Sequence, residues 1–97
     1  MAHTERLSLQ LHGEVVKIGL KEEFGKLRQR QKQNVVFAVL DDSRTQFIPV
    51  DFYDEDMRQV DYITEGDVVT FTFKACGYLS NDKYWPSYHG LIVEKLK

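Results

Sequence analysis

Hydrophobic and polar residues alternate along most of this chain, which is the pattern of β-strands that bury one face. The alternation predicts strands over five stretches, residues 7–20, 34–40, 45–53, 67–76 and 84–96. Polar segments that contain Gly, Asp, Asn or Ser separate several of these stretches, as expected of turns and hairpin loops. The pattern therefore predicts an all-β domain.

The first predicted strand changes phase part-way along its length. Its apolar positions lie on both sides of Gly13, and they are Leu7, Leu9 and Leu11 before it and Val16, Ile18 and Leu20 after it. A one-residue shift beside a glycine predicts a β-bulge, which bends a strand. A long bent strand suits a small barrel, where one strand pairs with two different neighbours. The fifth predicted strand is expected to break at Pro86 and to bulge near Gly90.

The third predicted strand has two distinct faces. One carries Ile48, Val50 and Phe52, and the other carries Phe47, Pro49, Asp51 and Tyr53. Because proline has no N–H to donate, we expect this strand to lie at an edge or to be irregular near Pro49. Residues 41–44 predict a tight turn before it, and residues 21–33 and 77–83 predict two long exposed hairpin loops.

A short helix is predicted after the third strand. Asp54 is placed to cap it, with Glu55 and Asp56 in a first turn where the helix dipole favours acidic residues. Its apolar residues recur every third position and would close one end of a barrel, namely Met57, Val60 and Ile63. Gly66 ends the helix. The fourth strand is predicted to point four side chains inward, those of Val69, Phe71, Phe73 and Ala75.

Composition predicts one domain over residues 1–97, since 97 residues with 42% hydrophobic content supply a single core. No apolar run approaches the roughly 18 to 20 residues that span a bilayer, and the first residues lack the plan of a signal peptide. We therefore expect a cytoplasmic protein with no membrane contact. Cys76, the single cysteine, has no partner for an internal disulfide and is expected to pack near a strand end.

The formal net charge of −2 conceals a strong asymmetry along the chain. Residues 17–32 hold six basic residues against two acidic ones, whereas residues 51–67 hold seven acidic residues against one basic residue. One part of the molecule is therefore expected to attract polyanions and another to repel them. Such a division would orient a charged ligand.

Residues 47–77, FIPVDFYDEDMRQVDYITEGDVVTFTFKACG, resemble a segment of bacterial single-stranded DNA-binding proteins. In that segment an apolar strand and a short helix lead to a Gly-polar-x-Val strand that ends in glycine. From about residue 7 to residue 95, the chain is similar to a small bacterial OB-fold family of unknown function, related to those proteins. The resemblance implies a five-stranded OB-fold Greek-key barrel with one short helix between strands three and four.

Two features depart from the pattern of those proteins. The sequence ends at Lys97 without an acidic, glycine-rich tail, so recruitment of replication partners through such a tail is not expected. The outer face of the third strand carries Asp51, where a nucleic-acid reader would favour a basic residue.

Motifs for catalysis or for cofactor binding are missing from the sequence. It has no phosphate-binding glycine loop, no zinc-spaced cysteine pair and no Gly-x-Ser-x-Gly turn. The three histidines, His3, His12 and His89, are too scattered in sequence to suggest a metal site. We therefore expect a protein that is not an enzyme and that has no metal or other cofactor.

Single-stranded nucleic acid is held by basic side chains along its phosphates and by aromatic side chains that stack on its bases. The candidates in the first predicted loop are Phe24, Lys26, Arg28, Arg30 and Lys32, and those in the second are Tyr78, Lys83, Tyr84 and Trp85. The third strand adds Phe47 and Tyr53, and Phe37 is a weaker candidate on the second strand. The prediction is sequence-tolerant binding of single-stranded nucleic acid, with DNA favoured over RNA.

A second interpretation is an OB-fold protein-protein interaction or assembly module without nucleic-acid binding. The basic loop would then be a solvated hairpin, and Tyr84 and Trp85 would fill a barrel mouth or a subunit contact. A homo-oligomer, either a dimer or a tetramer, is expected under both interpretations. Solvent-facing Phe24, Tyr78 and Trp85 beside the basic loop would favour the first, and burial between subunits would favour the second.

Overall fold

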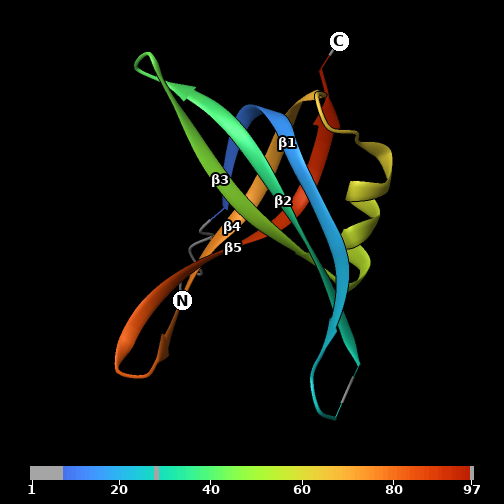
Figure 1. Ribbon diagram of the computed structural model, residues 1–97, viewed down its shortest axis with the longest axis vertical. Coiled ribbons are helices and arrows are strands. Elements are labelled where there is room, and N and C mark those ends of the chain that lie inside the picture. The colour runs from blue at the N-terminus through green and yellow to red at the C-terminus, as the bar shows by residue number, and fades with distance from the viewer. Residues whose placement is uncertain (1–7, 28, 97) are drawn as a thin grey trace, which may run out of the picture.

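The computed structural model describes residues 8–27 and 29–96, which form a closed five-stranded barrel (Figure 1). Its elements in chain order are β1 (Ser8–Phe24), β2 (Arg30–Asp41), β3 (Arg44–Tyr53), the 3-10 helix η1 (Asp54–Tyr62), β4 (Val68–Ser80) and β5 (Lys83–Lys95). Around the barrel the strands follow the order β1-β2-β3-β5-β4. The predicted OB-fold barrel, with its helix between the third and fourth strands, is confirmed.

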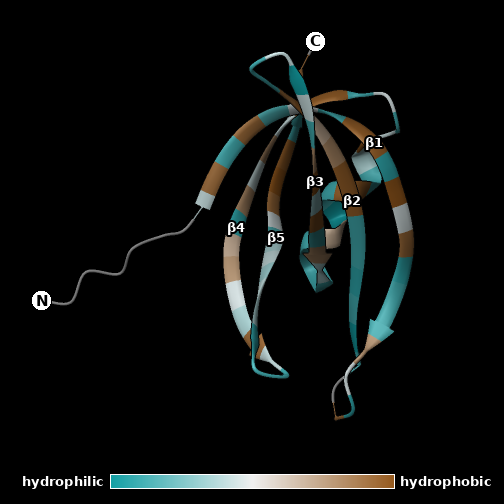
Figure 2. Ribbon diagram, turned by 60° about the vertical axis from the view of Figure 1, so that its left-hand side comes forward, coloured by the Kyte–Doolittle hydropathy of each residue, from teal (hydrophilic) through white to brown (hydrophobic). Residues whose placement is uncertain are grey.

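The interior is built from the alternating apolar residues. Those that are buried are Val15, Val35, Phe37, Val50, Phe52, Met57, Val60, Ile63, Val69, Phe71 and Phe73. The brown and teal bands of Figure 2 follow this alternation along the strands. Phe37 stacks on Phe71 with 3.9 Å between ring centroids, so Phe37 is a core residue and not an outward-facing one. The apolar stripe of η1 covers one end of the core, as predicted.

β1 pairs with β4 through its first half and with β2 through its second half, as a long bent strand requires. The bend does not lie at Gly13, however. Gly13 keeps its pairing with Val69, and the register against β2 shifts between Val15 and Lys17. A Cβ at Gly13 would lie 2.8 Å from the carbonyl oxygen of Ala38, so close packing explains this glycine. The predicted position of the bulge was therefore wrong.

The two predicted long loops are mostly strand. β1 runs on to Phe24 and β2 starts at Arg30, while β4 runs on to Ser80 and β5 starts at Lys83. We call residues 21–33 the β1–β2 arm and residues 77–86 the β4–β5 arm; both project from the same end of the barrel (Figure 1). Most side chains of the arms are exposed, so polar residues form strands here through backbone pairing and cross-strand pairs. Gln33, where the β1–β2 arm meets the barrel, is buried.

The start and end of η1 also differ from the prediction. Asp54 makes no capping hydrogen bond, and its carboxylate instead contacts β2. The helix ends at Tyr62, and Gly66 forms the later turn into β4, where its φ of +98° suits glycine. The N–H of Gly66 donates to the carbonyl oxygen of Val15 at 2.8 Å, which ties this turn to β1.

The seam between β3 and β5 is the most weakly paired part of the barrel. In the described residues a single parallel bridge, Asp51 with His89, joins the two strands. β3 is neither an edge strand nor irregular at Pro49, contrary to the prediction, because it lies between β2 and β5 and keeps its register with β2. Pro49 is tolerated because it lies outside the single bridge to β5. β5 is continuous through Pro86 and bulges beside Gly90, because Phe73 pairs with Gly90 and Thr72 with Ile92. The bulge was predicted correctly and the break was not.

In residues 8–27 and 29–96, no helix has the length and the apolar character that a membrane crossing demands.

Candidate nucleic-acid interface

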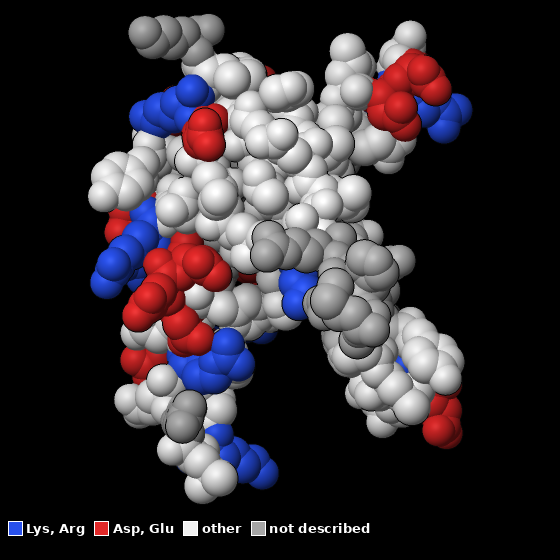
Figure 3. All heavy atoms as spheres, turned by 180° about the vertical axis from the view of Figure 1, so that it is seen from behind, with Lys and Arg blue, Asp and Glu red and all other residues white. Residues whose placement is uncertain are grey.

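The two arms carry most of the predicted site residues. Figure 3 shows basic atoms at the tip of the β1–β2 arm and acidic atoms at the tip of the β4–β5 arm. Lys26 is exposed at the first tip, and Arg28 lies outside the described residues. Across the described parts of the chain, no carboxylate lies within salt-bridge distance of Lys26, Lys32 or Lys83. These three cations are therefore available to an anionic ligand.

The β4–β5 arm presents different residues on its two faces. Tyr78 lies opposite Trp85 in the ladder and Ser80 lies opposite Lys83, so these four residues share one face. Leu79 and Tyr84 are paired on the other face. The indole N–H of Trp85 donates to the Ser80 carbonyl oxygen at 3.3 Å, which holds the ring along the arm. The large side chains of both faces are exposed to solvent, namely Tyr78, Leu79, Tyr84 and Trp85.

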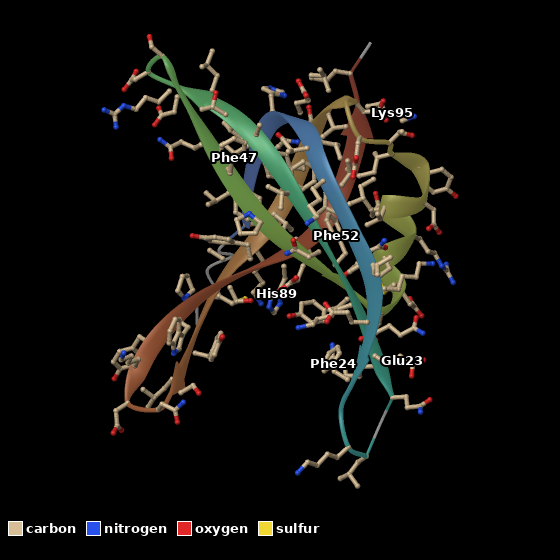
Figure 4. The ribbon with its side chains drawn as sticks, in the orientation of Figure 1. Glu23, Phe24, Phe47, Phe52, His89 and Lys95 are labelled. Atoms are coloured by element: carbon tan, nitrogen blue, oxygen red, sulfur yellow. The ribbon has the colours of Figure 1, made fainter. Side chains whose placement is uncertain are left out.

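An aromatic cluster links the β1–β2 arm to the barrel. It is formed by Phe24 of β1, Tyr53 of β3 and His89 of β5. The rings of Phe24 and Tyr53 meet edge to face with centroids 5.8 Å apart, and those of Tyr53 and His89 are 4.6 Å apart. Figure 4 shows Phe24 and His89 toward the end of the barrel from which the arms project. Three strands far apart in sequence thus supply one cluster.

Two cations of β2 lie against this cluster. The guanidinium carbon of Arg30 is 5.1 Å from the centroid of Phe24 and 5.4 Å from that of Tyr53. The ammonium of Lys32 is 5.7 Å from the centroid of Phe24. The register explains this, because Arg30 pairs with Phe24 and Lys32 with Tyr53. The site thus combines cations with aromatic faces.

Asp54 follows directly after β3 and contacts Arg30. Its Oδ2 accepts from Arg30 Nε at 3.0 Å and lies 2.9 Å from Arg30 Nη2, and its Oδ1 accepts from the Gln31 backbone N–H at 3.0 Å. The Gln31 N–H, and then Arg30, lower the pKa of the Asp54 carboxyl below its ordinary range. The charge of Arg30 is therefore already paired in the free protein.

The surroundings of His89 favour its neutral form. Partial burial lowers its pKa below the ordinary value of 6.5, Asp51 opposes this shift, and Lys74 and Arg30 add to it. Asp51, the residue least expected at such a surface, accepts a hydrogen bond from the Asn34 side-chain N–H at 3.0 Å. The negative charge of Asp51 is thus partly offset.

Phe47 lies away from the cluster. It is 63% exposed, and it lines an open apolar groove of about 370 Å³ together with Leu9, Ile48 and Tyr88. Figure 4 shows Phe47 well separated from Phe24 along the barrel. The structure thus brings together Phe24, Arg30, Lys32 and Tyr53, but not Phe47.

Sequence reasoning missed two members of this site, Asp54 and His89. His89 was set aside as an isolated histidine, although the alternation of β5 puts it on the same face as Trp85. Cys76 is half-buried on the neighbouring strand, with its Sγ 3.9 Å from His89 Nδ1. In the described residues, no three His, Cys, Asp or Glu side chains are grouped to hold a metal ion.

Comparison with known proteins gives a likeness in structure alone. No protein-family model and no curated protein matches the sequence. Rim1, a mitochondrial single-stranded DNA-binding protein of Saccharomyces cerevisiae, superimposes with a TM-score of 0.74 at 14% identity, over 96% of this chain and 98% of Rim1. The N-terminal domain of PriB from Thermoanaerobacter tencongensis gives 0.64 at 16% identity, over 93% and 96%.

A third neighbour is the single-stranded DNA-binding protein of Plasmodium falciparum, solved in complex with single-stranded DNA. It gives a TM-score of 0.60 at 12% identity and covers 100% of both chains. The chain shares the OB-fold of these proteins. The resemblance expected from residues 47–77 is thus confirmed at the level of the fold.

Proposed function

We propose that this protein binds single-stranded nucleic acid, with DNA favoured, without sequence preference and without catalysing a reaction. The observation that carries the proposal is the aromatic cluster with its two cations, placed between two projecting arms. Stacking on an aromatic side chain contributes roughly 1 to 3 kcal/mol per base and tolerates any base, because every base has a π-face. Cations beside the rings would hold the phosphates between successive bases.

The proposed path runs from one arm to the other. It starts at Lys26, passes Phe24, Lys32 and Tyr53, and reaches the Tyr78, Lys83 and Trp85 face of the β4–β5 arm. Arg28 is a further proposed contact, and Phe47 is an outlying one on the barrel wall. Tyr84 lies on the other face of the β4–β5 arm and is proposed below as a subunit contact. The Plasmodium falciparum neighbour, solved with single-stranded DNA, supports this reading of the fold by analogy.

Fluorescence polarisation with labelled oligo-dT tests the proposal. If about four phosphates are neutralised, log K should fall with log salt at a slope near −3, since each phosphate on a single strand contributes about −0.7. Duplex DNA of the same length should bind more weakly, because its bases are stacked inside the helix. Absence of binding at low salt, or equal affinity for duplex, would contradict the proposal.

A matched pair of variants localises the contact. Lys32→Gln should weaken binding and make the salt slope shallower by about 0.7. Lys95→Gln removes the same charge at the opposite end of the barrel, where Lys95 pairs with Asp67 at 3.4 Å (Figure 4). It should leave the slope unchanged.

We further propose assembly as a homo-oligomer through the Leu79 and Tyr84 face of the β4–β5 arm. Tyr84 is 84% exposed in the single chain, and exposed aromatic residues are enriched at subunit contacts. Because Tyr78 and Trp85 lie on the other face, assembly in this way would leave them open to nucleic acid.

A further inference from the structure

The carboxylate of Asp54 fills an anion-binding cradle formed by Arg30 and Gln31 at the start of β2. Two guanidinium nitrogens of Arg30 meet Asp54 Oδ2 at 2.9 and 3.0 Å, and the Gln31 backbone N–H donates to Oδ1 at 3.0 Å. A guanidinium beside a backbone N–H is also the donor set with which proteins hold phosphate oxygens. The cradle thus suits a phosphate group as well as a carboxylate.

The cradle is open to solvent and adjoins the aromatic cluster. The side chains of Arg30 and Asp54 are 49% and 43% exposed. An ion pair this exposed is weak and is screened by salt, so another anion is able to exchange with the carboxylate. The guanidinium also lies 5.1 Å from the centroid of Phe24, which would put a bound phosphate beside a stacked base.

The backbone does not account for an acidic residue at this position. Asp54 has a φ of +50°, in the left-handed region that Asn and Asp adopt more readily than other non-glycine residues. Asn would meet this requirement equally well and would still accept from the Gln31 N–H. The negative charge of Asp54 serves to pair with the Arg30 guanidinium.

We infer that Asp54 occupies a phosphate subsite in the free protein and that a phosphodiester group of the single-stranded ligand replaces it on Arg30 and on the Gln31 N–H. The inference rests on the proposed function. It adds that the Asp54 carboxylate competes with the ligand for Arg30 and the Gln31 N–H. Asp54 then lowers affinity by keeping one cation paired until the ligand arrives. Removal of the Asp54 charge should leave Arg30 free to bind a phosphate without first breaking an ion pair.

Asp54→Asn is the variant that tests this inference, because it keeps the acceptor for Gln31 and removes the competing charge. Affinity for oligo-dT at low salt should rise roughly two- to fivefold, the range that an exposed ion pair supports. The slope of log K against log salt should become steeper by about 0.7, which corresponds to one more phosphate contact. If Asp54 only positions Arg30, the same variant binds more weakly, and the inference is wrong.

Two controls separate competition from general repulsion. Asp56→Asn removes an equal charge two residues further on, where no contact with Arg30 is found in the described residues, and it should leave the salt slope unchanged. Combining Asp54→Asn with Arg30→Gln should abolish the gain. An equal gain in Asp56→Asn, or a gain that survives without Arg30, would overturn the inference.

A second measurement does not depend on nucleic acid. Inorganic pyrophosphate, titrated into the wild-type protein and into Asp54→Asn, should shift the NMR resonances of the Gln31 amide and the Arg30 Nε–H, with tighter binding to the variant. Shifts in neither protein would overturn the subsite even if oligo-dT binds. If neither protein binds oligo-dT, the proposed function fails, while a Gln31 shift with pyrophosphate still supports the anion subsite.

Discussion

Gly90 is the residue whose identity the barrel constrains most directly. It is buried on β5, and a Cβ there would overlap the ring of Phe52, which is itself fully buried. Gly77, on the paired strand β4, has only the Trp85 carbonyl oxygen at 3.8 Å, an ordinary contact distance. The two glycines therefore form a matched pair for substitution.

Gly90→Ala should lower the free energy of unfolding by roughly 1 to 3 kcal/mol, the usual cost of overpacking a core. Gly77→Ala should change it by less than about 0.5 kcal/mol, as for most surface positions. Urea denaturation followed by far-UV circular dichroism measures both. A Gly90→Ala protein as stable as Gly77→Ala would show that the Phe52 ring moves aside freely.

The lowered pKa of His89 should make the stability of the fold depend on pH. Its pKa is lower in the folded protein than the ordinary 6.5, so the unfolded chain takes up its proton first as pH falls. The stability linked to His89 is therefore fully present above pH 6.5 and is lost as pH falls through the folded-state pKa. The stability linked to Asp54 is lost at a lower pH, below the ordinary carboxyl pKa of 3.8, because folding also lowers the pKa of Asp54.

His89→Gln should flatten the decline in unfolding free energy between pH 7 and about pH 5, above the range where Asp54 titrates. Denaturant melts at a series of pH values measure this. A His12→Gln protein is the control, since His12 is an exposed histidine whose ring bonds the Thr70 hydroxyl at 2.8 Å. If the His89→Gln curve parallels that of the wild type, protonation of His89 is not linked to folding.

At the scale of elements, the two faces of the β4–β5 arm should have separable roles. Replacing Tyr78 and Trp85 together by Ala should reduce affinity for oligo-dT by at least tenfold, because stacked bases lose their platform. Replacing Leu79 and Tyr84 should leave that affinity within about threefold and reduce assembly, as sedimentation velocity would show. The reverse assignment of losses would contradict the proposed use of each face.

The arms also show where sequence reasoning stops. Hydrophobic alternation identified the five strands because each buries one face in the core. It missed the strand extensions at residues 21–24, 30–33 and 77–80, because most side chains there are exposed and leave no hydrophobic alternation in the sequence. Their pairing is visible only once the register of the barrel is known.

The residues of the site were predictable only in part. Phe24, Arg30 and Lys32 were expected from composition, because aromatic and basic residues in a polar segment suggest a ligand. Asp54 was mistaken for a helix cap, since its true partners, Arg30 and Gln31, lie 24 and 23 residues away in sequence. A contact between β2 and the end of β3 depends on tertiary structure, which no local pattern records.

At the scale of the whole molecule, the single bridge between Asp51 and His89 makes the junction of β3 and β5 the expected starting point of local unfolding in the described barrel. The other neighbouring strands share ladders of many residue pairs, so local unfolding in the native state should begin by separation of β3 from β5. Tyr53 and His89 stand on the two sides of that seam. A ligand stacked on both Tyr53 and His89 would connect β3 to β5. Binding would then stabilise the seam that is least protected in the free protein.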